Sequence, residues 1–66
     1  MKIKSDFIRL EKEKLGMSGS DLAKAAGFSR GGISTALAGG NASAKMVLAL
    51  AKVLDLEPER IIREED

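Results

Sequence analysis

The apolar positions between residues 22 and 37 recur at helical spacing with a single break. They can face one core only if the chain turns between Ala26 and Ser29, and these positions are Leu22, Ala26, Phe28, Ile33 and Leu37. Gly27 lies in that interval, and glycine often ends a helix because it takes a positive φ without a Cβ clash. Ser29 then offers a side-chain oxygen that can cap the next helix. The pattern predicts two short helices joined by a three-residue turn.

Two helices joined by so short a turn pack closely, and the sequence has a small residue and a branched residue at the positions that this packing requires. Ala23, four residues before Gly27, supplies a small side chain at the point of closest approach. Ile33, six residues after Gly27, supplies a buried branched side chain on the second helix, which is expected to run from Arg30 to about Ala38. A helical hairpin in an ordinary small bundle is the alternative interpretation of this pattern.

A further helix is expected before this pair, from about Ser5 to Lys14. Ser5 is its predicted N-cap, and Asp6 is placed favourably in the first turn. Its buried stripe is predicted to consist of Ile3, Phe7, Leu10 and Leu15. Lys12 and Lys14 are surface positions that either contact a flanking phosphate or are simply solvated. This helix is therefore interpreted mainly as scaffold.

Two helices are expected after the pair. The first, from Ala44 to about Leu54, is capped by Ser43, and its apolar face is predicted to comprise Val47, Leu50, Ala51 and Leu54, widened by Met46, Leu48 and Val53. Pro58 fits the first turn of a short fifth helix. Because the adjacent Ile61 and Ile62 cannot easily both face one core, we expect an exposed apolar patch there. The sequence predicts an all-α bundle of four or five helices, forming a single domain over residues 1–66 with a frayed acidic tail at 63–66.

The order of these residues resembles the helix-turn-helix of the Cro and C1 repressor class, also called the XRE class. The resemblance is carried by Gly16-Met17-Ser18, Leu22-Ala23, Gly27-Phe28-Ser29-Arg30, Ile33-Ser34 and a closing Gly39, which is expected to stop the helix at positive φ. It extends from about Ile3 to Ile62, and the stretch from Ser29 to Asn41 is also similar to the DNA-binding domains of phage lambda-type repressors. The resemblance implies a lambda repressor-like fold that binds double-stranded DNA.

In this class the N-terminal part of the second motif helix faces base edges in the major groove. The resemblance therefore implies base reading by Arg30, Gly31, Ser34, Thr35 and Asn41. Arg30 either pairs with O6 and N7 of guanine or clamps a phosphate. Asn41 either pairs with adenine or satisfies its own backbone in a turn. Gly31 and Gly32 each cost about 1 kcal/mol relative to alanine, so they either allow a close approach of the backbone to DNA or form a loose first turn.

Capped helix N-termini are the expected phosphate sites, because their free amide groups and positive dipole end attract anions. The candidates are Ser18, Ser29, Ser43 and Lys45. Gly19 departs from the family, which usually has a glutamine after the cap of this helix. That glutamine contacts phosphate and braces the first reading residue, so its absence is expected to leave Arg30 less constrained.

Charge is divided unevenly along the chain. Residues 1–54 hold nine Lys or Arg and four Asp or Glu, a balance of +5, whereas residues 55–66 hold two and six, a balance of −4. A basic body suits phosphate contact, although solvated faces without a partner give the same balance. There is no Cys and no His, so disulfides, thiolate metal ligands and the usual acid–base group are absent. We expect no cofactor, metal, small-molecule ligand or enzymatic activity.

The chain shows no targeting or membrane segment. Residues 1–14 are charged throughout, without the apolar stretch of a signal peptide. The longest apolar-rich run, residues 46–56, contains Lys52 and Asp55 and is too short to span a bilayer. A cytoplasmic, nucleoid-associated protein of a bacterium or phage is expected.

These observations favour a sequence-specific DNA-binding regulator, most simply a repressor that binds a near-palindromic operator as a homodimer. A chain of 66 residues buries a modest fraction of its surface, so a second subunit is a plausible source of stability, and Ile61 and Ile62 are the candidate dimer contact. Two alternatives stay open. One is an antitoxin-type regulator that uses these isoleucines to bind a protein partner of unknown identity, and the other is a helical interaction module that binds no DNA.

Overall fold

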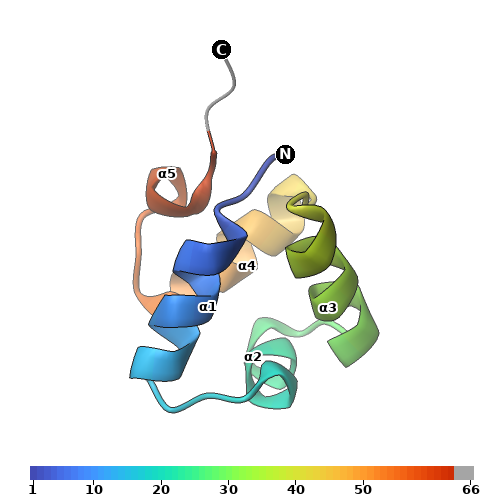
Figure 1. The fold of residues 1–66 in the computed structure, drawn as a ribbon, viewed down its shortest axis with the longest axis vertical. Coiled ribbons are helices and arrows are strands. Elements are labelled where there is room, and N and C mark those ends of the chain that lie inside the picture. The colour runs from blue at the N-terminus through green and yellow to red at the C-terminus, as the bar shows by residue number, and fades with distance from the viewer. Residues whose placement is uncertain (64–66) are drawn as a thin grey trace.

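The computed structural model describes residues 1–63, which form five helices joined by short connections (Figure 1). The helices are α1 (Ser5–Lys14), α2 (Gly19–Ala26), α3 (Arg30–Gly39), α4 (Ala44–Leu54) and α5 (Pro58–Ile61). The prediction of an all-α bundle is confirmed, and the expected helix boundaries agree within a residue or so.

One apolar core lies between the helices and is built around α4. This helix packs against α2 on one side and against α5 on the other, and α2 also packs against α3. In Figure 1, α1 crosses in front of α4, with α3 and α5 on opposite sides of that crossing. The side chains with the least exposure are Ile3, Ile8, Leu22, Ile33, Val47, Leu50 and Ile61. The core thus takes side chains from the N-terminal segment and from all five helices.

The buried face of α1 differs from the predicted stripe. Leu10 and Leu15 are 51% and 55% exposed, whereas Ile8 is fully buried and Phe7 only partly so. The predicted N-cap is also wrong, because Ser5 is already helical and Lys4 precedes the helix without a side-chain cap. The helix starts one residue earlier than predicted, because the amide of Ile8 donates to the carbonyl of Lys4 and closes the first turn there.

Two further details of the helices differ from expectation. Leu48 is 59% exposed, so it lies outside the α4 core face, which otherwise agrees with the prediction. Gly39 does not stop α3 at positive φ. It is the last helical residue, and Gly40 takes the left-handed conformation at φ +66°. The amide of Asn41 reaches back to the carbonyl of Ala36 across this turn, which requires the left-handed residue at position 40.

Residues 1–4 form an extended segment between two other parts of the chain. On one side, the amide of Ile3 donates to the carbonyl of Gly40, and the amide of Ala42 donates to the carbonyl of Met1. On the other side, the amide of Lys4 donates to Ile61 and the amide of Arg63 donates to Lys2, at 2.8 Å each. The segment therefore ties the loop after α3 to the end of α5.

The environment of the two C-terminal isoleucines follows from this pairing. Ile61 is fully buried and Ile62 is half-buried, where it pairs with Ile3 in an isolated antiparallel bridge. The two can share one core because α5 ends at Ile61 and the chain then becomes extended. The prediction that both lie at a dimer surface is wrong for Ile61, which has no exposed area to offer. The predicted frayed tail is wrong at Arg63, whose amide is bonded, and residues 64–66 lie outside the described residues.

Candidate nucleic-acid interface

The N-terminus of α2 is closed by a reciprocal pair of hydrogen bonds. The Ser18 hydroxyl accepts from the amide of Asp21 at 3.1 Å, and the Asp21 carboxylate accepts from the amide of Ser18 at 3.0 Å. These two bonds form a capping box at the cap predicted for Ser18. The hydrogen bond from the Ser18 amide, helped by the Ser18 hydroxyl and the charge of Lys24, holds the pKa of Asp21 below its ordinary value. The carboxylate is thus kept charged at the positive end of the helix dipole.

The turn between α2 and α3 has the predicted geometry. Gly27 is left-handed at φ +78°, and the amide of Phe28 donates to the carbonyl of Ala23 at 3.0 Å. Ser29 caps α3 by accepting from the amide of Gly32 at 2.9 Å. Ala23 is buried at 3% exposure on α2, which packs against α3.

Helix α3 divides into a buried and an exposed face. Ile33, Ala36 and Leu37 are in the core, as predicted for the first and last of them. The outer face carries most of the predicted base-reading residues, all exposed, namely Arg30, Gly31, Ser34 and Thr35. Apart from Arg30, these side chains are short. The backbone of α3 is therefore accessible along most of its outer face, and one long cation stands at its beginning.

The two glycines of the first turn of α3 differ in their surroundings. A Cβ at Gly32 would come within 3.0 Å of the Ser29 hydroxyl, so glycine here leaves room for the capping side chain. A Cβ at Gly31 would meet nothing within 4 Å, and its φ is not in the left-handed region. The fold thus gives a reason for glycine at position 32 and none at position 31.

Asn41 is exposed beyond the end of α3 and is held by the extended N-terminal segment. Its Oδ1 accepts from the ammonium group of Met1 at 2.8 Å, and its backbone forms an antiparallel bridge with Lys2. A side-chain amide oxygen has two lone pairs and the amide nitrogen has two donors. Asn41 therefore keeps its donors and one acceptor position for another partner.

Hollows lie on both sides of α3. On the side of α4, an open hollow is lined by residues of the outer face of α3, by Asn41 and by Ser43, with Met46 beneath them. Ser43 caps α4 as predicted and accepts from the amide of Met46 at 3.1 Å, with Lys45 exposed in the same turn. The N-terminus of α4 thus opens beside the predicted reading helix.

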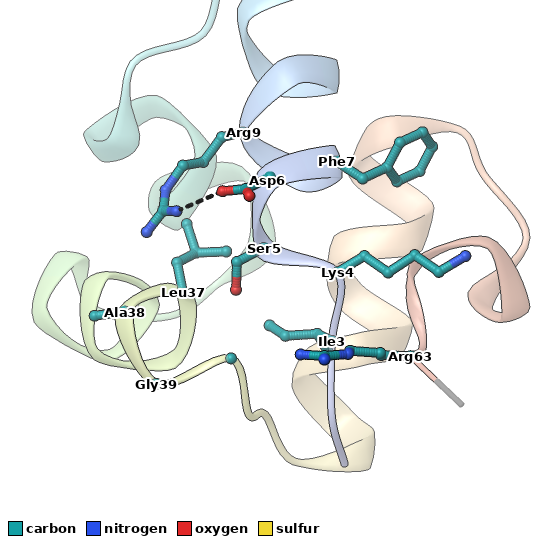
Figure 2. Close-up of a pocket in the computed structure, with 11 residues that line it drawn as sticks. Ile3, Lys4, Ser5, Asp6, Phe7, Arg9, Leu37, Ala38, Gly39 and Arg63 are labelled. Carbon is teal, nitrogen blue, oxygen red and sulfur yellow. Dashed lines mark hydrogen bonds and ion pairs between the residues drawn. The ribbon is translucent and has the colours of Figure 1, made fainter. Parts of the chain in front are cut away.

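On the side of α1, two adjoining hollows share Arg9 and Leu37 in their lining. One contains Arg30, Ser34 and Gly19, and the other contains Ala38 at the end of α3. Figure 2 shows the second, with Arg9 of α1 directed toward α3. We call the two together the α1–α3 groove. Arg9 is not among the predicted site residues, because no local pattern relates residue 9 to residues 30–38, and only the packing of α1 brings them together.

The described residues show neither a metal cluster nor a membrane span. Over residues 1–63, no three His, Cys, Asp or Glu side chains are grouped so that they could hold a metal ion. In the same range, no helix is long and apolar enough to cross a bilayer.

Comparison with known proteins gives one finding. The sequence model of the helix-turn-helix family matches residues 8–61, from within α1 to the end of α5. No curated protein and no solved structure matches the chain. The matched stretch includes both helices of the motif, the capped turn between them and all of the buried core residues except Ile3.

Proposed function

Because this chain belongs to the Cro/C1-type helix-turn-helix family of DNA-binding transcription regulators, we propose that it is a repressor that reads its operator with α3. The observation that carries the proposal is the exposed outer face of α3, whose opposite side is fixed in the core by Ile33 and Leu37. A helix held in this way can enter the major groove without rearrangement of the fold. Repression then follows if the bound protein blocks access to a promoter.

The proposed reading residues act through different chemistry. Arg30 presents its guanidinium fork to O6 and N7 of a guanine, and Thr35 offers its methyl group to a thymine methyl. Ser34 offers a hydroxyl to a base edge. Gly31 lets the backbone of α3 approach the floor of the groove. Asn41 contributes its free amide donors to a base or to the adjacent backbone.

Phosphate contacts are proposed at three helix N-termini. Ser18 caps α2, Ser29 caps α3 and Ser43 caps α4, and the remaining amide groups of each first turn have no partner within the helix. Lys45 adds a cation beside Ser43. Such contacts fix the register of a protein on the duplex without reading sequence.

The proposed assembly is a homodimer on a near-palindromic operator. Two identical domains related by a two-fold axis place their reading helices in successive major grooves, about 34 Å apart. Of the two isoleucines predicted to form the dimer contact, Ile62 is only half-buried and still has exposed surface for a partner subunit. The antitoxin alternative loses much of its basis, because Ile61 has no exposed area with which to bind another protein.

The test is selection of bound duplexes from a random DNA pool at moderate salt, followed by sequencing. Enrichment of a near-palindrome supports both sequence reading and two-fold assembly, and the half-site spacing gives the geometry of the dimer. Enrichment of a single half-site supports reading by a monomer. If the folded protein enriches nothing and its DNA affinity does not change with salt, the proposal fails and an interaction module without DNA binding is favoured.

A further inference from the structure

The α1–α3 groove gathers positive charge beside the reading helix. Arg9, Lys12 and Arg30 line the part of the groove nearest the beginning of α3, where the hollow has a volume of about 260 Å³. Arg63 lines the other part, at the end of α3. These four cations come from α1, α3 and the segment after α5, and two carboxylates, Asp6 and Glu13, accompany them.

The directions of the side chains concentrate this charge toward α3. Figure 2 shows the guanidinium groups of Arg9 and Arg63 turned to the side on which Leu37 and Gly39 lie. Lys4 also lines the hollow, but its amino group points to the opposite side of the extended N-terminal segment. Two arginines distant in sequence thus face the same edge of the reading helix.

The dimensions of B-DNA indicate which part of the duplex would lie over the edge of α3 that borders the α1–α3 groove. The major groove is about 12 Å wide and an α-helix with its side chains is about 10–12 Å across, so an inserted helix has a phosphate backbone along each flank. One flank of α3 is the α4 side, with Ser43 and Lys45. The other flank is the α1–α3 groove, where Ser34 and Arg30 stand at its border.

We propose that the second DNA backbone strand lies along the α1–α3 groove and that Arg9 is its principal phosphate contact, with Arg63 as a second contact. This inference rests on the proposed function and makes α1 a part of the DNA-binding surface. The partner is the phosphodiester backbone of the duplex that α3 reads.

Arg9 is free to make this contact because its present partner holds it weakly. Its guanidinium lies 3.3 Å from the Asp6 carboxylate. The Arg9 side chain is 47% exposed, and the Asp6 side chain is fully exposed. Exposed ion pairs of this kind contribute little free energy, so a phosphate can displace the carboxylate. Asp6 then has two effects on binding, since it competes for Arg9 and also repels the approaching strand.

The test compares variants by fluorescence anisotropy with a labelled duplex at several salt concentrations. We expect Arg9→Gln to weaken binding about fivefold on all duplexes alike and to reduce the slope of log affinity against log salt by about 1. Asp6→Asn should strengthen binding on all duplexes. The charge-matched control is Lys52→Gln, in the last turn of α4, because Lys52 lines none of the hollows beside α3.

The outcomes separate this inference from the proposed function. If Arg9→Gln and Arg63→Gln both behave like Lys52→Gln while Arg30→Ala loses binding, the groove is not a contact and the reading function stands. If the unmodified protein shows no salt-dependent DNA binding, the proposed function itself fails. Circular dichroism spectra that match the unmodified protein confirm that each variant is folded. If Arg9→Gln does not fold, the affinity and salt slope of Arg63→Gln test the groove instead.

Discussion

The amide of Phe28 donates a hydrogen bond of 3.0 Å to the carbonyl of Ala23, across the left-handed Gly27. Together with the bond from the Gly27 amide to the carbonyl of Lys24, it ends α2 and turns the chain out of the helix. The Ser29 side chain then caps α3 within two residues of Gly27, so hydrogen bonds over a very short stretch set how the two packed helices are joined. The orientation of the outer face of α3 relative to the core follows from this relationship.

Replacing Gly27 tests the turn directly. A Cβ at this position would meet nothing within 4 Å, so the cost of Gly27→Ala is that of a left-handed alanine, about 1 kcal/mol. Urea unfolding followed by circular dichroism should show this loss. Gly39→Ala is the matched control, because Gly39 is helical and also has open space, and it should stabilise the protein by up to about 1 kcal/mol. Equal effects of the two substitutions would contradict the assigned role of Gly27.

Gly31 offers a test in which stability and binding should change in opposite directions. Since nothing in the fold occupies the space beside it, Gly31→Ala should stabilise α3 by up to about 1 kcal/mol. The added methyl group lies on the outer face and should weaken DNA binding about tenfold if the backbone approaches a base or a phosphate there. Thermal unfolding and a binding titration on one preparation give both values. Unchanged affinity would instead assign Gly31 to a tolerated first turn.

The capping box makes stability depend on pH. The folded-state pKa of Asp21 is lowered by the Ser18 amide, the Ser18 hydroxyl and Lys24, so the contribution of the carboxylate is fully present above its unfolded pKa, about 4. That contribution is lost as the pH falls through the folded-state pKa. Asp21→Asn should therefore be less stable than the unmodified protein at pH 7, and the two should converge in stability in strong acid. A difference that is constant with pH, measured by urea unfolding, would contradict this account.

Arg30 distinguishes reading from anchoring. Lysine keeps the positive charge but lacks the planar fork that pairs with guanine. Arg30→Lys should therefore lose preference at one base position, by about 1–3 kcal/mol of discrimination, while keeping most of its affinity for unrelated DNA. Binding to a set of duplexes with single base changes measures this. A uniform loss across the set would assign Arg30 to a phosphate instead.

Two apolar residues whose surroundings differ from expectation give a stability test. Ile61 is fully buried, so Ile61→Ala should cost about 2–5 kcal/mol, and Ile61→Val about 1 kcal/mol if the alanine variant does not fold. Leu48 is 59% exposed, so Leu48→Ala should change the free energy of unfolding by less than about 0.5 kcal/mol. Denaturant unfolding of the variants would reverse this order if Ile61 instead lay at a surface.

The sequence by itself determined the parts of this protein that depend on neighbouring residues. The caps at Ser18, Ser29 and Ser43 and the left-handed Gly27 were predictable, because a capping bond spans three residues and a helix stop is set by one glycine. The core positions Ile33 and Leu37 followed from helical spacing over the same short stretch. The two helices and their turn were therefore evident from local chemistry, and the family followed from the resemblance that the same residues carry.

The tertiary structure decided what depends on contacts between distant parts of the chain. The apolar residues of α1 fit more than one helical face, and the assembled fold buries Ile8 and leaves Leu10 exposed. Residues 1–4 pair with the loop after α3 and with the end of α5. The same pairing buries Ile61 and brings Arg63 to the groove that Arg9 lines. Periodicity within one helix carries no information about which other segment will lie against it, so these positions required the assembled fold.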